Sequence, residues 1–90
     1  MDFEWDSKKA QANQQTHGVS FHEAATVFGD PLAITFAVPD HSLDEERYLT
    51  FGMSSYRLLL VISHTDRMGR IRIISARPMT RQEKIIYEEG

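Results

Sequence analysis

The spacing of apolar and polar residues predicts two helices in the first third of the chain. Residues 7–17 are good helix formers without proline. Asp6 before them is a favoured N-cap residue, and Gly18 after them can adopt the left-handed conformation that ends a helix. A capping-box pattern at Ser20–Glu23 opens the second helix, which ends before Pro31. The apolar stripe of this second helix consists of Phe21, Ala24, Ala25 and Phe28.

From Leu32 onward the period of the pattern changes from helical to extended. Apolar and β-branched runs predict four strands, at residues 32–38, 48–53, 58–64 and 70–75. An acidic loop at residues 40–46 separates the first two of them. The run Leu58–Ile62 is continuously apolar, which is typical of a central strand buried on both faces.

The two ends of the chain supply the remaining predicted elements. A second capping box at Thr80–Glu83 opens a last helix, in which Ile85, Ile86 and Tyr87 are expected to face inward. Residues 2–5 alternate polar and apolar side chains, a pattern that could form a short edge strand.

The order helix, helix, four strands, helix predicts an α+β fold in one domain, residues 1–90. Short hairpin connections make the sheet mainly antiparallel. The two N-terminal helices are available to cover one face of this sheet, and the C-terminal helix follows its last strand. The other face of the sheet is then expected to stay partly open.

Charge is divided unevenly along the chain, although the net charge is only −3. Residues 1–46 hold two lysines against nine acidic residues, a net charge of −7. Residues 47–90 hold seven arginines and one lysine against four acidic residues, a net charge of +4. A positive half of this kind would attract a polyanion such as nucleic acid. The alternative is that the two halves pair their charges on folding.

The strand Arg70–Ile73 alternates arginine with isoleucine. Its two isoleucines are expected on one face of the sheet, and Arg70 and Arg72 on the other. Arg77, Arg81 and Arg47 lie near the ends of strands in the same sheet. Guanidinium groups that converge beside one face could bind phosphates in a two-bonded geometry. A solvated strand face paired with the N-terminal acids is the alternative interpretation.

The four histidines show no spacing that is typical of a metal site, so we expect no metal and no cofactor. His64 alone is a candidate for proton transfer, because it closes the central strand beside the arginine-bearing one. Glu46 could act as a general base, and Tyr87 could stack on a base or pack in the core. The sequence has no nucleophile elbow, triad pattern or phosphate loop, which argues against proteases, nucleotide-fold kinases and dehydrogenases.

The composition also indicates a cellular compartment. The chain has no cysteine, which fits a reducing environment. Its longest apolar run is too short to span a bilayer, and its acidic start does not resemble a signal peptide. We therefore expect a cytoplasmic protein.

Two longer stretches resemble a known family. The first comprises Phe3–Asp6, Lys8, Asn13 and His17–Ala24, and the second comprises Arg70–Arg77, Thr80–Glu83 and Tyr87. In this order and over almost the whole chain, they closely resemble the BrnT family. The resemblance implies a RelE-like fold and the toxin role in a type II toxin–antitoxin pair. It further implies metal-independent ribonuclease activity that inhibits translation.

The resemblance also implies site residues and a partner. Arg72, Arg77 and Arg81 match the C-terminal motif, while Arg47 follows a loop that varies in such proteins. The implied partner is a BrnA antitoxin with a ribbon-helix-helix domain that binds DNA, in a two-plus-two complex in which the toxin alone could be monomeric. An acidic, partly apolar antitoxin segment is expected on the arginines, and binding to the acidic N-terminal helices is the alternative.

RNA cleavage without a metal needs three kinds of group. A base takes the proton of the 2′-hydroxyl, an acid gives a proton to the leaving 5′-oxygen, and cations stabilise the charged phosphorane. The arginines, with Arg70 among the RNA-binding candidates, meet the third need, and His64, Glu46 and Tyr87 are the candidates for the other two. A non-catalytic module that binds RNA or an acidic protein segment through the same arginines is the alternative function.

Overall fold

The computed structural model describes residues 1–39 and 46–90. Most of the acidic loop expected at residues 40–46, including His41 and Glu45, therefore lies outside the described residues. Within the described ranges, no helix is long and apolar enough to cross a membrane.

The first two helices form where the sequence predicts them. α1 (Ser7–His17) is capped by the carboxylate of Asp6, which accepts hydrogen bonds from two backbone N–H groups of the first turn at 2.8 and 3.2 Å. Gly18, with φ of 70°, ends α1 in the left-handed conformation. α2 (Phe21–Thr26) follows and tightens into the 3-10 turn η1 (Val27–Gly29).

The capping box expected at the start of α2 is only half formed. Ser20 Oγ accepts a hydrogen bond from the backbone N–H of Glu23 at 3.0 Å. The Glu23 carboxylate does not reach back to Ser20 but accepts a hydrogen bond from Ser54 Oγ at 2.8 Å. The prediction of a reciprocal bond is therefore wrong, because a tertiary contact between α2 and the turn after the third strand takes the carboxylate.

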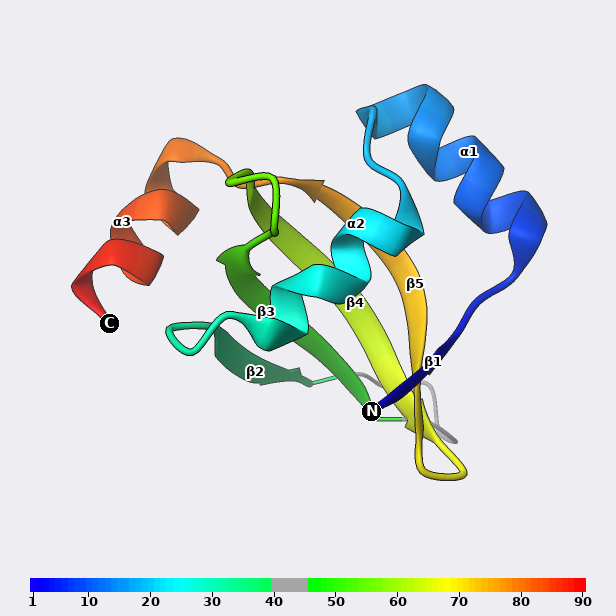
Figure 1. Cartoon of the computed structure of the whole chain (residues 1–90). Coiled ribbons are helices and arrows are strands. Elements are labelled where there is room, and N and C mark those ends of the chain that lie inside the picture. The colour runs from blue at the N-terminus through cyan, green and yellow to red at the C-terminus, as the bar shows by residue number, and fades with distance from the viewer. Residues whose placement is uncertain (40–45) are drawn as a thin grey trace.

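Five strands form one mixed sheet in the order β1-β5-β4-β3-β2 (Figure 1). They are β1 (Asp2–Glu4), β2 (Ile34–Val38), β3 (Arg47–Met53), β4 (Leu59–Arg67) and β5 (Arg70–Pro78). β1 runs parallel to β5, and the other neighbours are antiparallel. The prediction of four strands is thus wrong by one. β1 joins the sheet because Phe3 packs on Phe28, with ring centroids 5.4 Å apart, while the β1 backbone pairs with the outer edge of β5.

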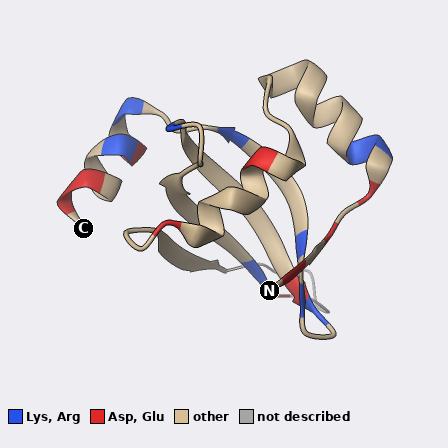
Figure 2. Cartoon of the chain, viewed as in Figure 1, with Lys and Arg blue, Asp and Glu red and all other residues tan. Residues whose placement is uncertain are grey.

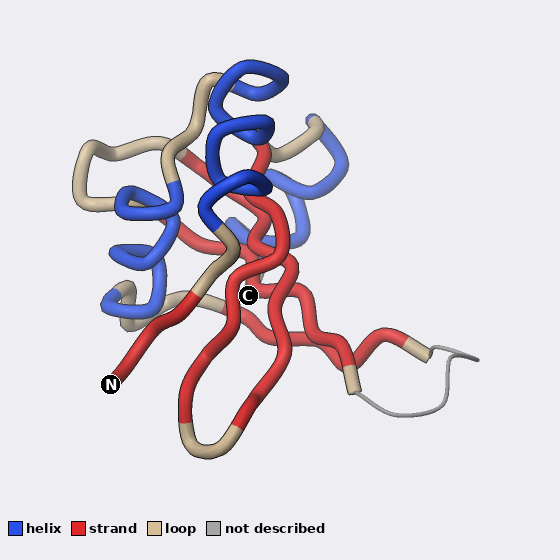
Figure 3. The backbone as a smooth tube through the Cα atoms, turned by 90° about the vertical axis from the view of Figure 1, so that its right-hand side faces the viewer, coloured by secondary structure: helices blue, strands red, loops and turns tan. Residues whose placement is uncertain are grey.

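The hairpin of β4 and β5 extends beyond the predicted strand ends at residues 64 and 75. Its turn residues, Met68 and Gly69, have φ of 53° and 79°, and two positive φ values match the right-handed twist of the flanking strands. The apolar pattern stops at His64, but backbone pairing continues through polar residues to this turn. Figure 3 shows the turn at one end of the molecule, with the helices gathered at the other.

β4 is the central strand, and Leu60, Val61 and Ile62 are all buried, as the unbroken apolar run predicts. The side chains alternate between two clusters. On the face covered by α1 and α2, the buried cluster consists of Val19, Phe21, Ala24, Val27, Leu60, Ile62, Ile73 and Ala76. On the other face, a smaller buried cluster consists of Phe51, Val61 and Met79, with Leu49, Leu59 and Tyr87 partly buried against it.

The last helix, α3 (Arg81–Glu89), begins with the complete capping box that the sequence predicts at Thr80. Ile85 and Ile86 were expected to face inward, and this expectation is wrong because they are 38% and 39% exposed. Two residues of α3 contact the sheet instead: Glu83 binds Arg77 of β5, and Tyr87 packs against the smaller cluster. They are four positions apart and share one face of the helix. The isoleucines fall outside this face.

Candidate functional site

Arg70 and Arg72 lie on the sheet face opposite α1 and α2. Ile71 and Ile73 pack against the helix-side cluster, so the period-two pattern turns the arginines between them toward the other face. This face, which we call the arginine face, carries Arg70, Arg72 and Arg77 of β5 and Arg47 of β3. Figure 2 shows basic positions along β5 beside acidic positions on β1.

Arg77 reaches the arginine face only because β5 contains a bulge. Arg72 and Arg77 are an odd number of positions apart, so a regular strand would turn them to opposite faces. The pairing shifts between Ser63 and His64, leaving Ile74 of β5 as an extra residue. Beyond the bulge, Arg77 lies opposite Val61, which belongs to the smaller cluster on the arginine-face side.

The pairing of β1 with β5 brings an acidic residue to the arginines. Glu4 lies directly opposite Arg72 in the parallel ladder. Its Oε2 accepts a hydrogen bond from Arg72 Nη1 at 2.9 Å, and its Oε1 lies 3.9 Å from Arg70 Nη1. The two guanidinium groups therefore share one carboxylate, which holds Arg72 by a hydrogen bond and Arg70 by a longer ion pair.

Arg47 shares the arginine face but stands two strands away from Arg72. It pairs with Thr65 of β4, and Thr65 pairs in turn with Arg72 of β5. Two strand spacings put the Cα atoms of the two arginines about 10 Å apart. The arginine face is thus basic on both sides of the central strand.

Arg77 forms a two-bonded ion pair with Glu83 at the start of α3. Arg77 Nη1 donates to Glu83 Oε1 at 2.7 Å, and Nη2 donates to Oε2 at 2.9 Å. These hydrogen bonds lower the pKa of Glu83 from 4.5 to about 2 and raise that of Arg77. The pair joins the end of β5 to α3 and holds the guanidinium in one orientation.

The two remaining C-terminal candidates lie on α3. Arg81 is exposed at its first position. Tyr87 packs against the smaller cluster, and its Oη donates a hydrogen bond to Asp30 Oδ2 at 2.6 Å. This hydrogen bond raises the pKa of Tyr87 to about 12. The hydroxyl therefore anchors α3 to the segment before β2.

His64 lies away from the arginine face. It is 5% exposed on the helix-covered side of β4, between the rings of Phe28 and Tyr48, at centroid distances of 4.9 and 5.7 Å. Its Nε2 forms a hydrogen bond of 2.7 Å with Thr50 Oγ1. Burial lowers the pKa of His64, which favours the neutral ring. The sequence placed His64 beside the arginine strand, and the structure turns its side chain to the opposite face.

Glu46 is exposed just before β3, next to Arg47. Its Oε2 accepts a hydrogen bond from Tyr48 Oη at 2.7 Å, which raises the pKa of Tyr48. Tyr48 stacks on His64, so this carboxylate lies on the helix-covered side of the sheet, whereas Glu4 stands on the arginine face at its β1 edge.

Comparison with known proteins identifies the family. A family model described as the ribonuclease toxin BrnT of type II toxin–antitoxin systems matches residues 5–83. This chain belongs to the BrnT family. The crystal structure of the Brucella abortus ribonuclease toxin BrnT is similar with a TM-score of 0.65 at 19% sequence identity, over 90% of this chain and 99% of that one. No curated protein matches the chain. The family resemblance seen in the sequence is confirmed, and the structural likeness supports the α+β fold.

For a BrnT chain, the arrangement of the arginine face has a direct chemical meaning. Guanidinium groups at fixed positions on an open sheet can bind the charged oxygens of a phosphodiester. Within residues 1–39 and 46–90, no three His, Asp or Glu side chains cluster in a way that could hold a metal ion. The described groups suited to charge stabilisation here are the arginines.

Sequence reasoning did not single out Glu4 or Glu83 as site residues of this BrnT chain. The alternation in residues 2–5 turns Glu4 away from Phe3, which signals its face but not its partner. Its contact with Arg72 depends on the β1–β5 pairing, 68 positions apart along the chain. Glu83 was assigned only to the capping box, where its Oε1 accepts from Thr80 N at 2.8 Å while also binding Arg77.

Proposed function

We propose that this BrnT toxin is a metal-independent endoribonuclease that acts in the cytoplasm and inhibits translation by cleaving RNA. Membership of a ribonuclease toxin family supports RNA as the substrate. The observation that carries the proposal is the arginine face itself. Three arginines of one strand share an open sheet face, and carboxylates hold two of them, Arg72 and Arg77, at bonding distances of 2.7 to 2.9 Å.

The proposed reaction uses RNA's own 2′-hydroxyl as the nucleophile. The 2′-oxygen forms a bond to the adjacent phosphorus, the bond from phosphorus to the 5′-oxygen breaks, and the 2′-proton passes to a base. The leaving 5′-oxygen takes a proton from an acid, and the product strand ends in a 2′,3′-cyclic phosphate. Arg72 and Arg77 stabilise the additional negative charge of the phosphorane, because preorganised donors act most strongly where charge develops.

We assign the base to a carboxylate on the arginine face. Glu4 is half-buried and touches the same guanidinium that would bind the phosphate, so a phosphate on Arg72 comes within reach of its carboxylate. Glu46 precedes Arg47 in the chain but has less support than Glu4, because its carboxylate bonds Tyr48 on the helix-covered side. His64 and Tyr87 have weaker support, because the His64 ring faces the helix side and the Tyr87 hydroxyl is bonded to Asp30. Arg81 extends the basic surface onto α3.

The test is cleavage of RNA in excess EDTA by the purified chain. We expect strands that end in 2′,3′-cyclic phosphate, and at least a hundredfold loss of rate in Arg72→Gln. Lys8→Gln removes the same charge from exposed α1 and serves as the matched control. RNA that stays intact at high protein concentration would refute the enzyme. If the intact RNA is bound, the chain is a non-catalytic binding module and not an enzyme. The carboxylates that already pair the arginines favour this alternative.

We further propose a BrnA-type antitoxin as the partner, through an acidic and partly apolar segment that covers the arginine face. Phe36 is 40% exposed there and packs on Phe51 with centroids 5.1 Å apart, so apolar surface adjoins the charges. Paired ribbon-helix-helix domains would then join two toxins. A competition experiment tests occlusion: an inactive toxin that binds RNA and antitoxin together would contradict it and favour binding at the acidic N-terminal helices.

A further inference from the structure

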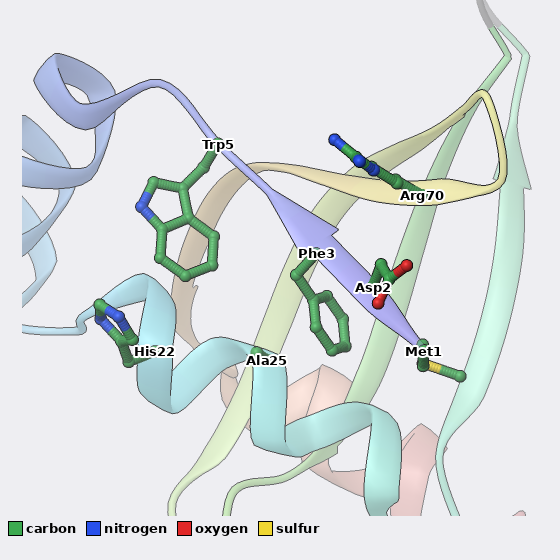
Figure 4. Close-up of a pocket in the computed structure, with 7 residues that line it drawn as sticks. All are labelled: Met1, Asp2, Phe3, Trp5, His22, Ala25 and Arg70. Atoms are coloured by element: carbon green, nitrogen blue, oxygen red, sulfur yellow. The ribbon is translucent and has the colours of Figure 1, made fainter.

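A solvent-open surface cavity of about 530 Å³ lies between the edge strand β1 and helix α2, beside the arginine face. Figure 4 shows its lining side chains. They are Met1, Asp2, Phe3, Trp5, His22, Ala25 and Arg70. A volume of this size suits a small ligand with an aromatic ring, such as one nucleotide. Apart from Arg70, its lining residues have no part in the proposed RNA cleavage.

The aromatic residues of the cavity have a spacing that suits a flat ring. Phe3 and Trp5 are two positions apart in an extended segment, so their side chains leave the backbone on one side, roughly 6.6 Å apart. Stacked bases are separated by roughly 3.4 Å, so a base between two aromatic groups needs about twice that distance. Figure 4 shows both rings turned toward α2.

The α2 side of the cavity leaves room for such a ring. Ala25 lines the cavity where α2 faces β1. Its side chain is a single methyl group, so it takes up little of the space between the two elements. The His22 ring stands at 82° to that of Trp5, with centroids 4.9 Å apart, and offers nitrogen atoms for hydrogen bonds. Aromatic and imidazole surfaces with adjacent hydrogen-bonding groups are typical of sites that read single-stranded bases.

Arg70 connects the cavity to the arginine face. It lines the cavity, its side chain is 60% exposed, and its Nη1 lies 3.9 Å from the carboxylate that Arg72 binds. β1 is only three residues long and forms the edge of the sheet, so a ligand can pass from the cavity around this edge to the arginines. A nucleotide with its base in the cavity therefore has a guanidinium within reach of its phosphate.

We propose that this cavity, the base pocket, binds one unpaired nucleobase of an RNA whose phosphates lie on the arginine face. The inference rests on the proposed function and deepens it, because it assigns the group that positions RNA for cleavage. Stacking against the aromatic rings holds the base, and Arg70 holds its phosphate. RNA with bases free of pairing is then bound in preference to duplex.

The test follows the indole N–H resonance of Trp5, which is the single tryptophan of the chain. The labelled protein is titrated with adenosine 5′-monophosphate and, as the matched ligand control, with ribose 5-phosphate, which lacks the base. We expect a saturable shift of the indole signal with the nucleotide only. The larger side chain in Ala25→Leu would fill part of the cavity. This variant should weaken nucleotide binding roughly 5- to 150-fold, the range that corresponds to one lost base–aromatic stack.

A matched variant controls for general effects of substitution. Ala12→Leu places the same side chain on exposed α1. This control should bind the nucleotide as the parent does. Equal indole shifts with ribose 5-phosphate, or unchanged nucleotide binding by Ala25→Leu, would overturn the base pocket.

RNA cleavage by the same preparations separates the two proposals. Cleavage without any nucleotide-dependent shift of the indole signal leaves the ribonuclease proposal intact and refutes the base pocket. A saturable shift that Ala25→Leu weakens, in a protein that does not cleave RNA, supports the base pocket and refutes the enzyme. A shift produced by peptides from the partner but not by nucleotides would assign the cavity to protein binding and refute the inference.

Discussion

Replacing Arg77 by alanine should lower RNA cleavage far more than it lowers stability. The change removes both hydrogen bonds to Glu83, at 2.7 and 2.9 Å. The difference between pKa 4.5 and about 2 for Glu83 would equal about 3 kcal/mol if this pair carried all of it. The Arg77 side chain is 38% exposed and Thr80 N–H also bonds Glu83, so solvent screening reduces the expected loss to about 1 kcal/mol.

In Arg77→Ala, the loss of cleavage rate, expressed as a free energy, should be larger than the loss of stability. A donor that faces the developing charge of the phosphorane contributes about 3 kcal/mol, or a factor of 10² to 10³ in rate. Urea unfolding measures the free energy of unfolding, and single-turnover cleavage of a short RNA measures the rate. Both are measured on the same preparation, at a temperature where the variant is fully folded.

Glu83→Gln is the matched control for Arg77→Ala. It breaks the ion pair but leaves the guanidinium, so stability should again fall by about 1 kcal/mol. Cleavage should fall by less than about tenfold, because the charge that meets the phosphate remains. If the two variants lose cleavage equally, Arg77 acts only by joining β5 to α3, and its assignment to the reaction is refuted.

Three further predictions concern the carboxylates and the packing of the sheet. The depressed pKa of Glu83 stabilises the fold above pH 4.5 and loses this effect as pH falls to about 2, so urea unfolding across this range should show a smaller loss in Glu83→Gln than in the parent. Glu4→Gln should abolish most cleavage without lowering RNA affinity, while Glu88→Gln, exposed on α3, should cleave normally; normal cleavage by Glu4→Gln would remove Glu4 as the base. Gly52→Ala should cost about 1–3 kcal/mol in thermal unfolding, because its Cβ would stand 2.6 Å from Val27 Cγ1. Gly29→Ala, whose Cβ meets no heavy atom within 4 Å among the described residues, should leave stability unchanged or raise it slightly, and an equal loss in both variants would contradict the packing argument.

The helices and the central strand could be predicted from local pattern. Asp6 and Gly18 mark the two ends of α1 by side-chain chemistry that acts within a few residues, and the structure has both caps. The apolar run of β4 predicts burial on both faces because no alternation is left to turn toward water, and this prediction is confirmed. Motif similarity over almost the whole chain further indicated the BrnT family before any fold was known.

The composition of the candidate site was decided by tertiary structure. The alternation of residues predicts the face of Arg72. Arg77 shares that face only because of the bulge at Ile74, and no residue type in the strand predicts this bulge. Glu4 meets Arg72 because two strands from opposite ends of the chain pair in parallel, which no local rule specifies. His64 is turned from the arginines by the same register, because its place in β4 sends its ring to the helix side. Short-range periodicity therefore determined which residues could share a face, and long-range strand pairing determined which of them meet.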